Sequence, residues 1–275
     1  MATYSTLTMT TKVMPKLTYL NEEKLKSFNR KKFLKTKPFP WSNIQGFLTQ
    51  EGFEQLYQDF PVLALFEKHT NIKRGYGQRP HNRYYLAYQN SVYHSDNSKG
   101  TIKHAELPLA WQSFLEELST SPQYRHFICT ALDVPDYRVR FAWHVGFSGC
   151  EVSPHVDSND KVGTHIVYFN TSADWSKEWG GSTLVLDKKQ TAIQNPDYDD
   201  FAKTQAVRIT DNHSFLFKNQ PEAWHGVEPL SCPEGSYRRL FNIIFEFPPG
   251  VTRNQPSTFS LKQQIRSLAN SVLRR

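Results

Sequence analysis

The sequence predicts a mainly β domain, an antiparallel sandwich or barrel of the jelly-roll type, with helices on either side of it in the chain. From Tyr137 onward, apolar and polar residues alternate, which is the pattern of a half-buried strand. Further short apolar runs follow, separated by clusters of Gly, Pro, Asn and Asp. Because most of these runs have no helix-length segment between them, the pattern favours antiparallel pairing in a closed β fold.

The first 130 residues are predicted to be helices with an irregular region between them. Residues 21–35 mix charges with Leu25, Phe28 and Phe33 and predict one helix. Thr49 is a suitable N-cap for a second helix that ends at Pro61, and residues 111–118 carry the apolar stripe of a third. We expect these helices to support the sheet.

Six strands are predicted after them, at residues 139–143, 164–170, 182–186, 206–209, 214–217 and 238–247. Beyond the last strand, Leu261, Ile265, Leu268 and Val272 lie on one face of a predicted C-terminal helix. That face is expected to pack on the domain or to form a homodimer. Binding to another partner chain or to an anionic membrane surface is the alternative.

Length and composition fit one domain without a membrane span. The chain has 275 residues, of which 38% are hydrophobic and 14% aromatic, enough for one substantial core. It has no apolar run of the roughly 20 residues that cross a bilayer, and no secretory signal at its start. Three cysteines without close pairing fit a reducing compartment. We therefore expect a cytoplasmic protein.

The net charge of +7 does not predict a nucleic-acid-binding protein. Residues 249–275 carry five cations and no acids, which leaves +2 for the rest of the chain. A nucleic-acid-binding domain is expected to have a broad basic surface instead. We expect residues 1–37 to be an N-terminal extension, partly disordered and with one helix, and residues 249–275 to be a basic helical tail.

The residues that carry the chemistry are His155, Asp157 and His225, followed by Arg238. Two histidines and one carboxylate hold Fe(II) in non-haem oxygenases and leave three coordination positions open. His155 and Asp157 are two residues apart, so both can face the same side of an extended strand. His225 follows Asp157 by 68 residues, far enough to return on another strand.

A longer set of motifs resembles one known family. The segments Ser153-Pro154-His155-Val156-Asp157, 164–170, 174–175, 179–184 and 225–229, with Arg238 after them, are similar to the prolyl-4-hydroxylase-like branch of the Fe(II)/2-oxoglutarate-dependent dioxygenases. The resemblance covers residues 38–248. It implies a double-stranded β-helix, a jelly roll of the cupin kind, with a helical part at 38–132 and the core at 133–248.

The resemblance also implies cofactors and roles. His155, Asp157 and His225 would hold Fe(II), while 2-oxoglutarate and O2 are consumed, succinate and CO2 are released, and ascorbate serves as a reductant. An arginine suits the far carboxylate of 2-oxoglutarate because its charge is fixed and it offers two parallel donors. We assign that role to Arg238 rather than Arg239, since Arg238 aligns with the inward-facing positions. Tyr168 either donates its hydroxyl to the same carboxylate or is a core aromatic.

Residues 73–85 hold four cations and three tyrosines and are either a substrate lid or an ordinary solvated loop. Arg79, Arg83 and Tyr84 are the candidate substrate residues.

The leading prediction is a hydroxylase of a small molecule, an amino acid or a specialised metabolite. Hydroxylation of a prolyl or other residue in a protein or peptide is the first alternative, and a non-catalytic metal- or metabolite-binding protein of the cupin type is the second.

The sequence also constrains the type of oxidation in part. Asp157 disfavours halogenation, because halide-binding members of the family usually carry Gly or Ala at that position. Desaturation and ring closure stay open, since they depend on how the substrate is held. The sequence does not identify the substrate, the position and stereochemistry of oxidation, or the oligomeric state.

Overall fold

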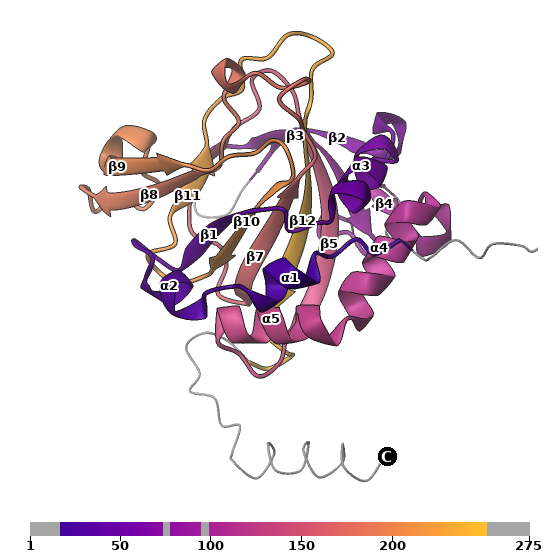
Figure 1. Cartoon of the computed structure of the whole chain (residues 1–275). Helices are drawn as coiled ribbons and strands as arrows, with labels where there is room; N and C mark the ends of the chain where they lie inside the picture. Colours follow the sequence, from indigo (N-terminus) through magenta and orange to yellow (C-terminus); the bar gives the residue numbers. More distant parts are fainter. Residues whose placement is uncertain (1–16, 74–77, 95–98, 252–275) are drawn as a thin grey trace, which may run out of the picture.

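Two antiparallel β-sheets form the body of the protein (Figure 1), in a computed structural model that describes residues 17–73, 78–94 and 99–251. The larger sheet has eight strands in the order β1-β10-β7-β12-β5-β3-β2, with β4 paired in parallel to β3. Its strands are β1 (Trp41–Gln45), β2 (Glu67–Ile72), β3 (His81–Tyr88), β4 (Thr101–Ile102), β5 (Arg138–Gly146), β7 (Lys161–Tyr168), β10 (His213–Lys218) and β12 (Arg238–Glu246).

The smaller sheet has four strands in the order β6-β11-β8-β9. They are β6 (Val152–His155), β8 (Leu184–Lys189), β9 (Phe201–Ala206) and β11 (His225–Val227). Successive strands from β5 onward alternate between the two sheets for most of their course, as in a jelly roll. This mainly β architecture agrees with the fold class predicted from the sequence.

In the part of the chain that the structure describes, five α-helices precede β5: α1 (Glu22–Lys26), α2 (Arg30–Lys35), α3 (Gln50–Gln58), α4 (Leu109–Thr120) and α5 (Pro122–Leu132). Helices α4 and α5 lie along one side of the larger sheet (Figure 1). Thr49 accepts a hydrogen bond from the Gly52 amide and caps α3, as its sequence position predicts. Ser121 caps α5 in the same way, through the amide of Tyr124.

The main hydrophobic core lies between these helices and the larger sheet. Trp111 of α4 is fully buried, and its ring lies 5.2 Å from Trp143 of β5, 5.1 Å from Phe241 of β12 and 5.2 Å from Phe169. Since the helices cover this face, the opposite face of the larger sheet is left to form a cavity with the smaller sheet. The aromatic core therefore supports the wall on which the site is built.

Several predicted elements differ from the observed ones. The predicted helix at 21–35 is two short helices, because Asn29 caps α2 and separates it from α1. The predicted strand at 206–209 lies earlier, at β9, where the chain pairs with β8. The region 38–132, predicted as helices and irregular chain, also contributes β1, β2, β3 and β4 to the larger sheet.

The N-terminal segment from residue 17 packs against the domain. Tyr19 and Leu20 are buried, and their amides donate to the carboxylate of Glu117 on α4 at 2.8 and 3.1 Å. Leu25 and Phe33 are buried in the same core. The described part of the predicted N-terminal extension is therefore attached to the helical layer. Residues 1–16 and the predicted C-terminal helix lie outside the described residues.

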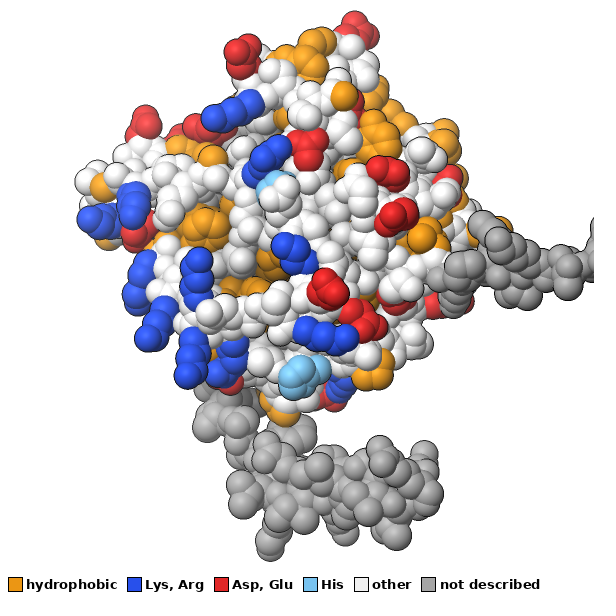
Figure 2. Space-filling view, in the orientation of Figure 1, with side chains coloured by type: hydrophobic (Ala, Val, Ile, Leu, Met, Phe, Trp, Pro, Cys, Tyr) orange, Lys and Arg blue, Asp and Glu red, His pale blue; other side chains and the backbone are white. Residues whose placement is uncertain are grey.

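Figure 2 shows Lys and Arg side chains gathered at the lower left of one face of the molecule. Helix α2, whose sequence is Arg-Lys-Lys-Phe-Leu-Lys, lies in this area in Figure 1. Phe33 is its buried residue, so the positive charges of the helix face outward. Among the described residues, no helix is both long enough and apolar enough to span a membrane.

Candidate functional site

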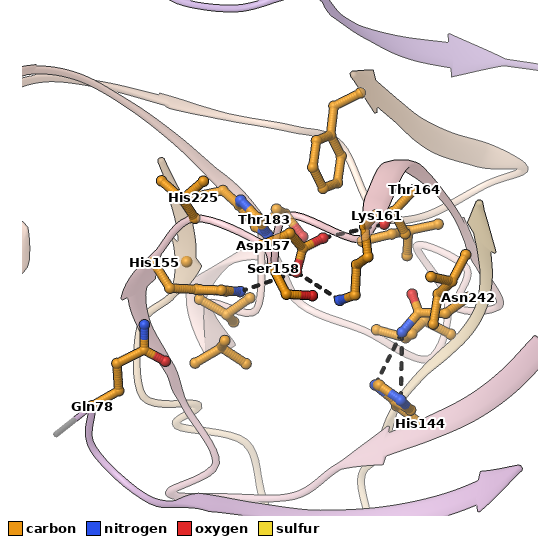
Figure 3. Close-up of a pocket in the computed structure, with 18 of the residues that line it drawn as sticks. Gln78, His144, His155, Asp157, Ser158, Lys161, Thr164, Thr183, His225 and Asn242 are labelled. Carbon is orange, nitrogen blue, oxygen red and sulfur yellow. Dashed lines mark hydrogen bonds and ion pairs between the residues drawn. The ribbon is translucent and has the colours of Figure 1, made fainter. Parts of the chain in front are cut away.

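The structure brings His155, Asp157 and His225 together at one end of the smaller sheet. His155 is the last residue of β6 and His225 the first of β11, and the two are directly paired across the strands. Their rings lie 4.3 Å apart, centroid to centroid. One potential ligand atom from each of the three residues lies within 4.8 Å of the others. The side chains converge in Figure 3.

Backbone carbonyls fix the orientation of both imidazoles. Nδ1 of His155 lies 3.0 Å from the carbonyl of Ser153, and Nδ1 of His225 lies 2.9 Å from that of Ala223. A carbonyl can only accept, so each Nδ1 carries the proton and each Nε2 carries the lone pair. Metal-binding histidines are held in this manner, with the outer nitrogen donating to a backbone carbonyl.

Asp157 completes the set as an anion. Its carboxylate lies 2.8 Å from Nζ of Lys161, accepts from Thr164 at 3.3 Å and is 4.0 Å from Nε2 of His155. Burial alone would raise the pKa of Asp157, but the charge of Lys161, together with the charges of His225 and His155 when they are protonated, holds it well below its usual value. The site thus offers two imidazole nitrogens and one negative oxygen.

Arg238, at the start of β12, lines the same cavity. It is 7% exposed, and it donates from Nε to the carbonyl of Gly181 at 2.5 Å and from a terminal nitrogen to Oγ1 of Thr183 at 3.3 Å. The Tyr168 hydroxyl is also bonded to Thr183, at 2.7 Å, and the guanidinium lies 5.4 Å from the Tyr168 ring. Within the described part of the chain, Arg238 has no ion pair.

A buried cation whose described neighbours are neutral is costly unless an anion meets it. Burial accordingly lowers the pKa of Arg238. The backbone at Gly181 has φ +84°, and a Cβ there would lie 3.0 Å from Cδ of Arg238. Glycine is therefore needed at this position both for its conformation and for the close approach of the arginine.

The cavity has a volume of about 770 Å³ and is lined by both sheets. It includes the three converging residues and Arg238, together with side chains to which the sequence analysis gave no individual role: Gln78, Tyr85, Tyr93, Lys161, Thr183 and Asn242. Asn242 of β12 and His144 of β5 contact each other across adjacent strands at 3.2 Å. They are labelled in Figure 3.

The three candidate substrate residues separate in the structure. Arg83 lines the cavity, where its guanidinium donates to the hydroxyl of Tyr93. Tyr84 is the next residue of β3, so it points to the other face of the sheet and packs against Phe147 instead. Arg79 is held by two carboxylates, Glu151 at 2.7 Å and Asp197 at 2.9 Å. The structure thus places only Arg83 of these three among the residues that line the cavity.

Residues 140–246 match the family model of the 2OG-Fe(II) oxygenase superfamily. The match covers 107 of the 275 residues. The matched segment runs from β5 to the end of β12 and contains His155, Asp157, His225 and Arg238. A comparison with curated proteins finds no match.

Solved structures show the same fold as this oxygenase. HygX from Streptomyces hygroscopicus, with nickel and 2-oxoglutarate bound, aligns with a TM-score of 0.53 at 10% identity, over 86% of this chain and 94% of that one. The carbocyclase SnoK from nogalamycin biosynthesis aligns at 0.52 and 12% identity, over 87% and 92%. A prolyl 4-hydroxylase from Pseudomonas putida also matches, at 0.49 and 14% identity, over 77% and 94%.

The family and its cofactors were predicted correctly from the sequence motifs: oxygenases of this superfamily use Fe(II), 2-oxoglutarate and O2. The residues of this chain fit those groups. Two neutral imidazoles and a carboxylate are a donor set for Fe(II), and a buried guanidinium suits a dicarboxylic acid.

Proposed function

We propose that this oxygenase hydroxylates an unactivated C–H bond of a small molecule that carries an acidic group. His155, Asp157 and His225 hold Fe(II) in this proposal, and Arg238 holds the far carboxylate of 2-oxoglutarate. Residues 38–248 are the catalytic unit, and the segments on either side flank it. When bound, the ferrous ion would activate O2, which is the oxidant, and 2-oxoglutarate would give up two electrons as it is converted to succinate and CO2; the protein supplies position and polarity.

Charge pairing within the cavity supports these assignments. The described lining residues include four cations and one acid, Asp157. The cations are Arg83, Arg140, Lys161 and Arg238. Lys161 is paired with Asp157, and Arg140 with Glu246 at 3.0 Å. Arg238 and Arg83 remain without a carboxylate partner among the described residues. If Arg238 receives 2-oxoglutarate, Arg83 is the cation left for the substrate.

The contacts of Arg83 are the observation that supports an acidic substrate. Its guanidinium touches the Tyr93 hydroxyl and lies 3.4 Å from Nδ1 of His144, while its Nε atom is buried without a hydrogen-bond partner. A partly buried guanidinium with an unused donor is well suited to a carboxylate or phosphate, which accepts two parallel hydrogen bonds.

The size of the cavity supports a small molecule rather than a long peptide. A volume of about 770 Å³ lies within the range of small-molecule sites, roughly 300–1,000 Å³.

Tyr168 is hydrogen-bonded to Thr183 and is not among the residues that line the cavity. In this proposal it orients Thr183 and Arg238, and its ring packs under the guanidinium.

Succinate formation from 2-oxoglutarate tests the proposal. The full chain with Fe(II) and ascorbate is incubated with matched panels of carboxylated metabolites, their amides and short peptides that contain proline. We expect turnover with a carboxylated small molecule, and a rise in KM at least tenfold for it in Arg83→Gln. Turnover that is confined to the peptide panel, or that is equal for acid and amide, contradicts the substrate class.

A further inference from the structure

A second group of metal-ligating side chains lies behind the wall of the cavity, away from His155, Asp157 and His225. Glu67 and His69 are two residues apart on β2, so they face the same side of the strand, and His94 reaches them from the chain that follows β3. One ligand atom from each lies within 4.8 Å of the others. Neither the family match nor the proposed oxygenase chemistry uses these residues.

The three side chains already converge on one carboxylate oxygen. Oε2 of Glu67 lies 3.1 Å from Nε2 of His69 and 2.8 Å from Nε2 of His94. Zinc bonds of about 2.0–2.1 Å at tetrahedral angles place ligand atoms roughly 3.3 Å apart. The observed separations need to widen by only a few tenths of an ångström to admit an ion.

The surroundings hold His69 in position. This residue is 2% exposed, and its ring lies between Tyr85, stacked at 5.3 Å, and Tyr93, edge-on at 4.6 Å. Between these two rings, Nε2 of His69 is directed at the carboxylate of Glu67.

The backbone beside Glu67 leaves little room for anything larger than the present residues. Gly100 has φ +58°, and a Cβ added there would lie 3.0 Å from Oε2 of Glu67. The β3–β4 connection therefore passes close to the carboxylate of Glu67 at a position that favours glycine. Two residues of that connection, His94 and Gly100, thus lie against Glu67 of β2.

We propose that Glu67, His69 and His94 form a binding site for a divalent transition metal, with zinc as the ion of best fit. Two imidazole nitrogens and one carboxylate oxygen are three ligands that Zn²⁺ accepts, and its fourth ligand would be water. Tyr93 precedes His94 and bonds to Arg83 in the cavity wall. An ion at this site thus fixes the chain that carries Tyr93 and keeps Arg83 in place.

The proposal is tested by titrating zinc into the metal-free full chain in competition with a chromophoric chelator, which gives the number of zinc ions bound per chain. Asp157→Ala combined with His155→Ala removes the candidate iron site, and we expect this variant to retain one equivalent of zinc. Adding His94→Ala or Glu67→Gln should remove it. His104→Ala is the matched control, because His104 pairs with Glu116 at 3.4 Å on the surface and should change nothing.

Two further readouts separate a metal site from hydrogen bonds alone. X-ray absorption at the zinc edge should show nitrogen and oxygen neighbours with imidazole scattering, and zinc should raise the Tm of the double variant but not of the variant that also lacks His94. Circular dichroism checks that each variant folds. The proposal is overturned if the double variant binds no zinc at tens of micromolar, or if His94→Ala leaves its stoichiometry unchanged. Neither result bears on the iron-dependent activity of the wild-type chain.

Discussion

Replacing Arg238 by methionine tests the assignment of the 2-oxoglutarate carboxylate directly. Methionine has a similar length and fills the buried space, but it removes the charge and both hydrogen bonds, to Gly181 and Thr183. Losing one partner of a buried, hydrogen-bonded charge pair costs about 2–5 kcal/mol. Since about 1.4 kcal/mol corresponds to a tenfold change in Kd, we expect 2-oxoglutarate binding to weaken at least roughly 30-fold.

The assay is an anaerobic titration of 2-oxoglutarate into the Fe(II)-loaded protein, followed by metal-to-ligand absorption. Arg239→Met is the matched control. Arg239 is adjacent in sequence, but its side chain bonds to Asp174 and stacks on Tyr57 rather than lining the cavity. A Kd within threefold of wild type in Arg238→Met, or an equal loss in both variants, refutes the assignment.

Three further predictions follow from the structure. Asp157→Ala removes the anionic ligand, so Fe(II)-dependent succinate formation should fall to background, and retained activity contradicts the metal assignment. Gly181→Ala forces a side chain into φ +84° beside Arg238, and we expect urea denaturation to show a loss of about 1 kcal/mol or more together with weaker 2-oxoglutarate binding. His165 is completely buried, and burial lowers its pKa from 6.5 to about 3. Because the unfolded chain takes up this proton and the folded chain does not, His165 lowers stability as the pH falls from about 6.5 towards 3, by up to about 1.4 kcal/mol per unit. His165→Gln should flatten that slope in denaturation curves, and an unchanged slope counts against the buried neutral imidazole.

The core strands were accessible from the sequence because they contain runs of apolar residues bounded by turn residues. Strands β5, β7, β10 and β12 were predicted within a few residues of their observed bounds, and most of their side chains from the apolar runs are buried. Strands β2 and β3 were not. Their sequences, Glu-Lys-His-Thr-Asn-Ile and His-Asn-Arg-Tyr-Tyr-Leu-Ala-Tyr, carry polar residues that line the cavity or the second cluster, so burial no longer follows hydrophobicity.

The site was accessible in part for a related reason. Metal ligands need particular residue types at particular spacings, so His155 and Asp157 stood out, as did Arg238 in its motif. Thr183 lies in one of the quoted segments but was given no role, because its contact with Arg238 joins residues that are distant in sequence. Lys161 was given no role either, although it pairs with Asp157 four residues before it. Arg79 and Arg83 looked alike in the sequence. Only the fold shows that Glu151 and Asp197 bind the first and that the second lies in the cavity.

The double ion pair of Arg79 has a consequence for how the protein responds to salt. Arg79 joins Glu151, just before β6, to Asp197, in the connection between β8 and β9, and its side chain is 41% exposed. Its neighbour Gln78 lines the cavity. Dissolved ions screen pairs at such an exposed position and act far less on buried ones. Ionic strength should therefore loosen the rim beside Gln78 while the buried contacts of Arg238 keep their geometry, so that buffer composition alters substrate entry before it alters co-substrate binding.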